Sequence, residues 1–182
     1  MFQLLPLATL MFGLLATSAT EATAPSYKAA PAHSEFPQRI GPYVRGEIHA
    51  FAGDDHSIGY DCYDWQIENA VTFYYYPVTD SAESQYASEV AGILEAHAGA
   101  RLVSERTSTI KKDGHLHRAF IATFNYDGVF SKTNQPLSSQ LVFISLPDHA
   151  IKVRSTSPAS QAALAEVNML RLVNEISWAF LP

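Results

Sequence analysis

Two histidines at alternate positions are the best candidate metal ligands in this sequence. His115 and His117 stand in the segment GHLH, directly after an Asp-Gly pair that predicts a hairpin turn. Alternate residues of a strand project to the same face, and neutral imidazoles bind zinc or copper well. Further ligands would have to come from His49 or from residues 54–56, which read DDH. The pattern allows a zinc or copper site, although two exposed histidines are more often only solvated polar residues.

Cys62 is the only cysteine in the chain. A reactive thiol or a dimer-forming disulfide would be its chemical uses. Its neighbours Asp61 and Asp64 argue against activation, because nearby negative charge raises the pKa of a thiol. We therefore interpret Cys62 as a small, partly buried apolar residue.

No motif with a known catalytic mechanism is found along the chain. The acidic turn GDDHS lacks the spaced ligands and closing glutamate of a calcium-binding EF-hand loop, so it is interpreted as a solvated turn. The sequence has no G-x-S-x-G elbow, no phosphate-binding glycine loop and no H-E-x-x-H motif. We predict no catalytic residue and no cofactor. A hydrolase whose site is assembled from scattered residues stays open as an alternative.

Size and charge limit the class of protein. The chain has 182 residues, of which 47% are apolar and 16% charged, which is typical of a globular domain. The net charge is -6, and lysine and arginine are not clustered anywhere. Nucleic acids and anionic lipids need a basic surface, so neither is expected as a partner.

The start of the chain resembles a secretion signal. An apolar run from Phe2 to Ala16 is too short to span a bilayer comfortably and is followed by small residues. We predict a signal peptide over residues 1–19, with cleavage as late as residue 24 as an alternative. No lysine or arginine precedes the run, so a retained anchor or a different start is a second alternative. Export implies the periplasm of a Gram-negative bacterium or secretion, with no transmembrane helix in the mature chain.

Residues 20–35 are rich in alanine, proline, threonine and serine and predict a flexible tether, followed by one α+β domain over residues 36–182. Alternation and turn signals predict seven strands, listed here with the two helices in chain order. The strands cover 43–51, 56–63 and 69–78, a helix covers Ala82–Ala98, further strands cover 101–112, 115–126, 139–146 and 150–156, and a helix runs from Ser157 and Pro158 to about Phe180. Hairpin turns between the strands indicate an antiparallel sheet of about six to seven strands.

The aromatic run VTFYYYPV is interpreted as core. In a strand, Val71, Phe73 and Tyr75 face one way, while Tyr74 and Tyr76 face the other. A strand that is apolar on both faces belongs in the middle of a sheet covered on both sides. A stacking surface for a ligand is one alternative interpretation, and a tyrosine redox relay, which no cofactor motif accompanies, is another.

Three apolar residues of the last helix lie off its main apolar stripe. Leu164, Val167 and Trp178 either cover a neighbouring strand or form an exposed patch on which a partner docks. Tryptophan is enriched at interaction hot spots, so Trp178 is the candidate partner contact of highest interest.

The order of these segments resembles exported bacterial proteins of the PsbP-like family. The resemblance is carried by FPQRIGPYVRGEIHAF, by SIGY, by AVTFYYYP and by the terminal EISWAF with Trp178, and it covers residues 36–182. It implies the fold of PsbP, Mog and DcrB-type proteins, an antiparallel sheet sandwiched by helices in α/β/α layers. It also implies a non-catalytic binding or assembly role, without identifying any site residue.

The expected function is therefore a non-enzymatic exported protein that binds or assists another component of the cell envelope. We expect a monomer. The alternatives are a zinc- or copper-binding protein that uses His115 and His117, and the hydrolase described above.

Overall fold

The computed structural model describes residues 36–50, 56–62, 67–112, 114–147 and 149–176. The predicted signal peptide, the tether, the acidic turn at 51–55 and Trp178 lie outside these residues, as do the side chains of His56 and Cys62. In the part of the chain that is described, neither helix has the length and apolar character needed to cross a membrane.

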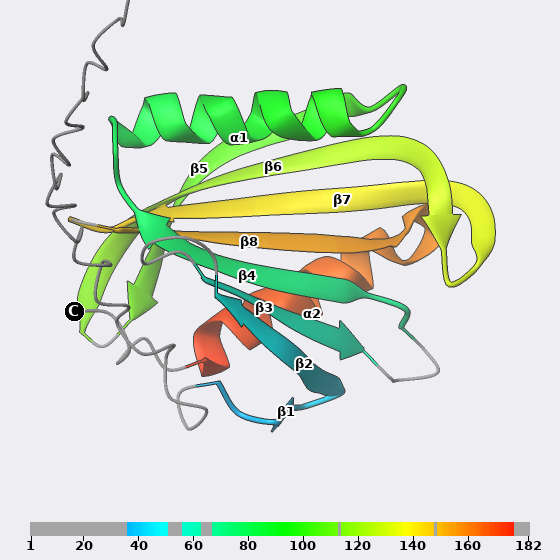
Figure 1. Ribbon diagram of the computed structural model, residues 1–182, viewed down its shortest axis with the longest axis horizontal. Coiled ribbons are helices and arrows are strands. Elements are labelled where there is room, and N and C mark those ends of the chain that lie inside the picture. Colours follow the sequence, from blue (N-terminus) through cyan, green and yellow to red (C-terminus); the bar gives the residue numbers. More distant parts are fainter. Residues whose placement is uncertain (1–35, 51–55, 63–66, 113, 148, 177–182) are drawn as a thin grey trace, which may run out of the picture.

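Eight strands form one sheet in which every neighbouring pair is antiparallel (Figure 1). Their order across the sheet is β1-β2-β3-β4-β8-β7-β6-β5. The strands are β1 Arg39–Ile40, β2 Tyr43–Ala50, β3 His56–Cys62, β4 Ala70–Pro77, β5 Arg101–Lys112, β6 His115–Phe130, β7 Thr133–Ser145 and β8 His149–Pro158. The helices are α1 Ala82–Ala96 and α2 Ala162–Glu175, with a short 3-10 turn at Ala159–Gln161 before α2.

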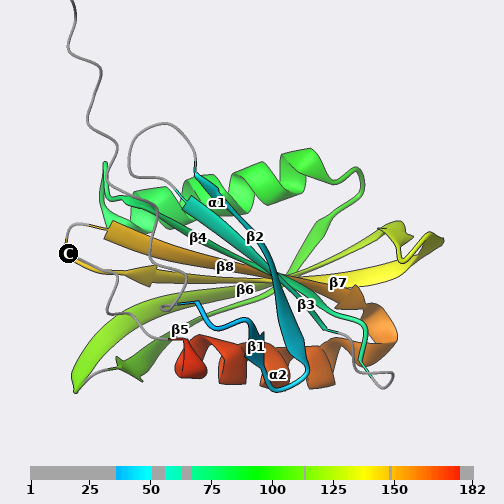
Figure 2. The same cartoon turned by 60° about the horizontal axis from the view of Figure 1, so that its bottom comes forward.

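The predicted fold class, a sheet of six to seven strands sandwiched by helices in PsbP-like α/β/α layers, is wrong. The described residues form a larger sheet of eight strands, with only two α-helices. One helix lies on each side of the sheet and covers only part of it (Figure 2). β5 is exposed over most of its length, as a helical layer over the whole sheet would not allow. Strands β6 and β7 run for 16 and 13 residues, longer than their apolar patterns predicted, and make the sheet the dominant element.

Helix α1 begins and ends where the sequence predicted, within two residues. The Ser81 side chain caps the first turn by accepting a hydrogen bond of 3.2 Å from the backbone N–H of Ser84. Gly99, with φ of +77°, turns the chain toward β5. The buried residues of α1 are Tyr86 and Ile93, which pack on Phe120, Phe143 and other apolar residues of β6 and β7.

Helix α2 begins later than predicted. Ser157 and Pro158 continue β8 instead of capping the helix, because they pair with Ser138 and Leu137 of β7. The helix starts at Ala162, and its N-cap residue makes no side-chain capping bond. Backbone pairing across the sheet therefore overrides the local Ser-Pro helix signal. The buried residues of α2 are Ala165, Met169, Leu172 and Val173, and the last three pack α2 on the sheet.

Strand β4 lies between β3 and β8, near the middle of the sheet. Val71, Phe73 and Tyr75 are buried in the core beneath α2, at 7% exposure or less. Tyr74 and Tyr76, on the face toward α1, are only half-buried. The side facing α2 is therefore fully covered, whereas the side facing α1 is covered only in part, where Tyr76 packs against the apolar cluster beneath α1.

Candidate functional site

The face of β8 that points toward α1 carries two basic residues at alternate positions. Lys152 is opposite Tyr74 of β4 in the sheet register, and Arg154 is opposite Thr72. Both basic side chains are half-buried. Two cations on one strand beneath one helix need compensation, because burial of a charge without a partner is unfavourable.

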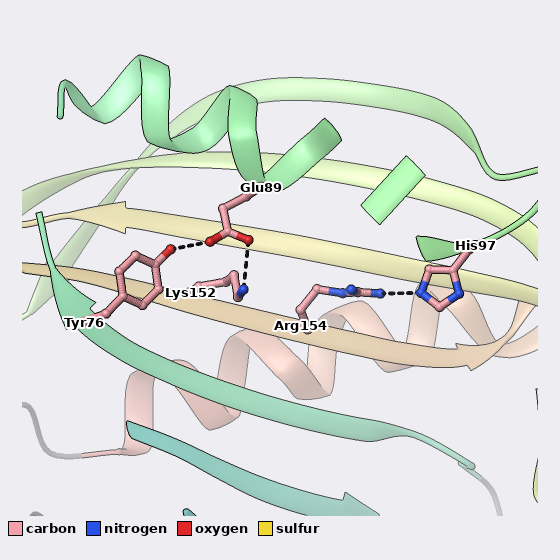
Figure 3. Close-up of polar contacts among 5 residues, drawn as sticks. All are labelled: Tyr76, Glu89, His97, Lys152 and Arg154. Atoms are coloured by element: carbon pink, nitrogen blue, oxygen red, sulfur yellow. Dashed lines mark hydrogen bonds and ion pairs between the residues drawn. The ribbon is translucent and has the colours of Figure 1, made fainter. Parts of the chain in front are cut away.

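The positive charge of Lys152 is neutralised by a carboxylate of the same chain (Figure 3). Its Nζ lies 2.8 Å from Glu89 Oε2, and Tyr76 donates a hydrogen bond of 2.7 Å to the other oxygen of the same carboxylate. The Nζ also lies 4.2 Å from the centre of the Tyr74 ring, within range of a cation–π interaction. Glu89 belongs to α1, so this cluster links the helix to β8 and β4.

Arg154 has only neutral contacts among the described residues. Its Nη2 donates a hydrogen bond of 3.0 Å to Ser139 Oγ and lies 3.4 Å from His97 Nε2, as Figure 3 shows for the histidine. Its Nε is buried and has no hydrogen-bond partner among the residues that the structure describes. In the described part of the chain, no carboxylate forms an ion pair with this guanidinium.

His97 follows α1 directly and is held by an aromatic neighbour. Its ring stacks on Tyr126 of β6, with centroids 4.2 Å apart and planes 17° from parallel. Burial, and secondly the positive charge of Arg154, lower the pKa of His97 from its ordinary value of 6.5. The imidazole is therefore neutral at pH 7, and its Nε2 lone pair is available to accept from Arg154.

An open hollow of about 330 Å³ adjoins the histidine stack at the end of α1. It is lined by Ala98, Gly99, Arg101, Asn125, Tyr126, Asp127, Pro136, Leu137 and Ala159. Tyr126 is both part of this lining and the stacking partner of His97. We call Arg154, His97, Ser139 and Tyr126 the Arg154 site.

His115 and His117 lie at the start of β6, and their ring centroids are 6.4 Å apart. Among the described residues, no group of three or more histidine, cysteine, aspartate or glutamate side chains is placed to hold a metal ion. His49 lies on β2, in the other half of the sheet. The structure therefore keeps His115 and His117 near each other, but His49 does not join them, and the described residues supply no third ligand.

Leu164 and Val167 are exposed on α2, at 45% and 64%. They do not cover a neighbouring strand. Trp178, the third predicted contact, lies outside the described residues.

The sequence reasoning missed Arg154 and His97 as a pair. The alternation in AIKVRST indicates that Lys152 and Arg154 share a face, and His97 ends an amphipathic helix. Nothing local to either segment shows that they meet, since 57 positions separate them.

Comparison with known proteins leaves the family unassigned. No family model and no curated protein matches the chain. A crystal structure of a protein of unknown function from Pseudomonas aeruginosa is similar, with 14% sequence identity and a TM-score of 0.38. The match covers 71% of this chain and 94% of the other. At that level the likeness identifies no function.

The lowered pKa of His97 predicts a pH dependence of stability. Below about pH 6.5 the unfolded chain protonates this histidine, whereas the folded protein keeps it neutral until the pH falls to its lower pKa. The contribution of His97 to stability is therefore complete above pH 6.5 and declines as the pH falls through this window. Urea unfolding measured at several pH values from 8 to 5 should show a steeper loss of unfolding free energy for the natural protein than for His97→Gln. Parallel profiles for the two proteins would contradict the assignment.

Proposed function

We propose that this protein is a non-enzymatic exported protein that binds another protein of the cell envelope, and that the Arg154 site receives an acidic side chain of that partner. The observation behind the proposal is the half-buried guanidinium of Arg154, whose described contacts are all neutral. A partner carboxylate would form a charge-assisted hydrogen bond there and supply the missing negative charge.

The neighbouring lysine provides an internal comparison. Lys152 lies two positions away on the same face and is paired with Glu89. Lys152 thus has a carboxylate partner within the fold, whereas the described contacts of Arg154 are a hydroxyl group and an imidazole. A cation needed only for stability is normally paired in this way, because an unpaired one is unfavourable.

Three further observations support a binding role. The half-buried rings of Tyr74 and Tyr76 on the same face offer amphipathic contact area. The predicted signal peptide puts partners in the envelope. The sequence resemblance to PsbP-like proteins implies binding or assembly as the role, although the layered fold predicted from it is not retained. The zinc or copper alternative depends on His115 and His117 alone and is not proposed.

The test uses two capped peptides, Ala-Glu-Ala and Ala-Gln-Ala, added to the isotope-labelled protein. We expect saturable NMR shifts at His97 and at the Arg154 side chain with the glutamate peptide only. Bound carboxylate also offsets the field of Arg154, so the pKa of His97 should rise when the peptide binds.

Arg154→Gln should abolish these shifts, whereas Arg118→Gln should retain them. Arg118 is a matched control because it is exposed and already paired with Glu83. Equal responses to the two peptides, or a response that survives Arg154→Gln, would refute the proposal.

A further inference from the structure

β5 is the outermost of the described strands at its edge of the sheet, and among these strands its neighbour is β6 alone. The strand runs for 12 residues, whereas the strand at the opposite edge, β1, has two. A long outer strand presents a row of unpaired backbone N–H and C=O groups, which is the usual template for pairing with another strand.

Side chains of both helices reach β5 only along its two faces. Tyr86 of α1 donates to Glu105 on one face, and Arg106 pairs with Glu166 of α2 on the other, both at 2.7 Å. The remaining direction, in the plane of the sheet, is covered by no described strand. A further strand can therefore approach β5 without displacing either helix.

Protective features are limited to the two ends of β5. A register shift between Leu102 and Ser104 interrupts the regular pairing at one end, and Lys111 and Lys112 lie at the other. No proline occurs in the strand. The regular stretch Ser104–Lys112 is therefore free of the bulges and prolines that normally block edge-to-edge pairing.

Symmetry selects one register for pairing of this stretch with itself. In a continuous antiparallel sheet, opposite residues project to the same face, so a two-fold axis must pass between one residue and the same residue of the other copy. For the whole of Ser104–Lys112 to pair, that residue is its midpoint, Ser108. Glu105 of each copy then lies opposite Lys111 of the other.

This register is chemically complementary. It creates two Glu105–Lys111 pairs, on the face toward α1, and puts Thr107 opposite Thr109. Lys111 makes no ion pair with any described residue of its own chain. Registers in which Glu105 or Arg106 lies opposite its own copy would instead bring like charges together, which is unfavourable for directly opposite residues.

We propose that β5 pairs with β5 of a second copy of this chain, around a two-fold axis at Ser108, so that the two sheets become one. This dimer replaces the monomer expected from the sequence. It is independent of the Arg154 site, which lies on β8.

Sedimentation velocity of the purified protein over a wide concentration range tests the dimer. We expect a monomer–dimer equilibrium that Lys111→Glu weakens about tenfold or more, because two attractive pairs become two repulsive ones. The double variant Glu105→Lys/Lys111→Glu should restore dimerisation, since it exchanges the charges and recreates both pairs. Lys132→Glu, at the exposed turn after β6, makes the same change in net charge and should leave the equilibrium unchanged.

Circular dichroism of each variant confirms that the fold is kept. A protein that is monomeric at every concentration would overturn the proposal. So would a dimer that is insensitive to Lys111→Glu, or a double variant that fails to recover association.

Discussion

Replacement of Tyr75 by aspartate is expected to destabilise the protein by about 3–5 kcal/mol, the range for a buried charge left without a partner. Tyr75 is 7% exposed in the core beneath α2, and its ring stacks on His149 with centroids 4.6 Å apart. The aspartate would lose this packing and either bury a charge or take up a proton. Urea unfolding followed by circular dichroism measures the difference.

The adjacent residue is the matched control. Tyr74 lies on the other face of β4, is half-buried, and has the Nζ of Lys152 4.2 Å from its ring centre. Tyr74→Asp keeps a carboxylate near water and a lysine, so it should cost less than about 2 kcal/mol. Tyr75→Phe, which keeps the ring, should cost no more than about 1 kcal/mol. A change below about 0.5 kcal/mol for Tyr75→Asp would contradict the burial of this ring.

The contrast between these two tyrosines shows what a local pattern can predict. The alternation of side chains in VTFYYYPV assigned residues to the correct faces of β4, and the Asp-Gly signal predicted the hairpin between β5 and β6, where Gly114 has φ of +84°. Neither pattern shows which face a helix covers. That depends on where α1 docks: its buried residues Tyr86 and Ile93 pack mainly with residues of β6 and β7, while Tyr76 of β4 packs only at the margin of this cluster.

The sequence also does not show when a local signal loses to pairing between distant strands. Ser157 and Pro158 have the composition of a helix start, yet their pairing with β7 keeps them in β8. The Arg154 site depends on the same kind of information, since β8, β7, β6 and the end of α1 each supply one of its residues. Such a cluster has no signature within any one segment.

The second large effect concerns the two apolar clusters on opposite faces of the sheet. Phe143 has no exposed surface and lies among Tyr86 and Phe120, with ring centroids 6.3 Å and 6.2 Å away. Met169 of α2 is equally buried in the cluster on the other face. Truncation creates a cavity in each case, so we expect losses of about 3–5 kcal/mol for Phe143→Ala and about 2–5 kcal/mol for Met169→Ala.

A double-mutant cycle tests whether the two clusters are independent. They share no residue and are separated by the sheet, so the two losses should add within about 0.5 kcal/mol. A stabilising osmolyte, added at the same concentration to every sample, keeps the double variant folded before urea is added. Phe143→Ala combined with Phe120→Ala provides the contrast, because these rings belong to one cluster and should couple by more than about 0.5 kcal/mol.

Strong coupling between Phe143 and Met169 would mean that strain passes through the backbone of β7, where Phe143 and Val142 face opposite clusters. The two helices would then stabilise the sheet as one unit, and the assignment of a separate core to each face would be wrong.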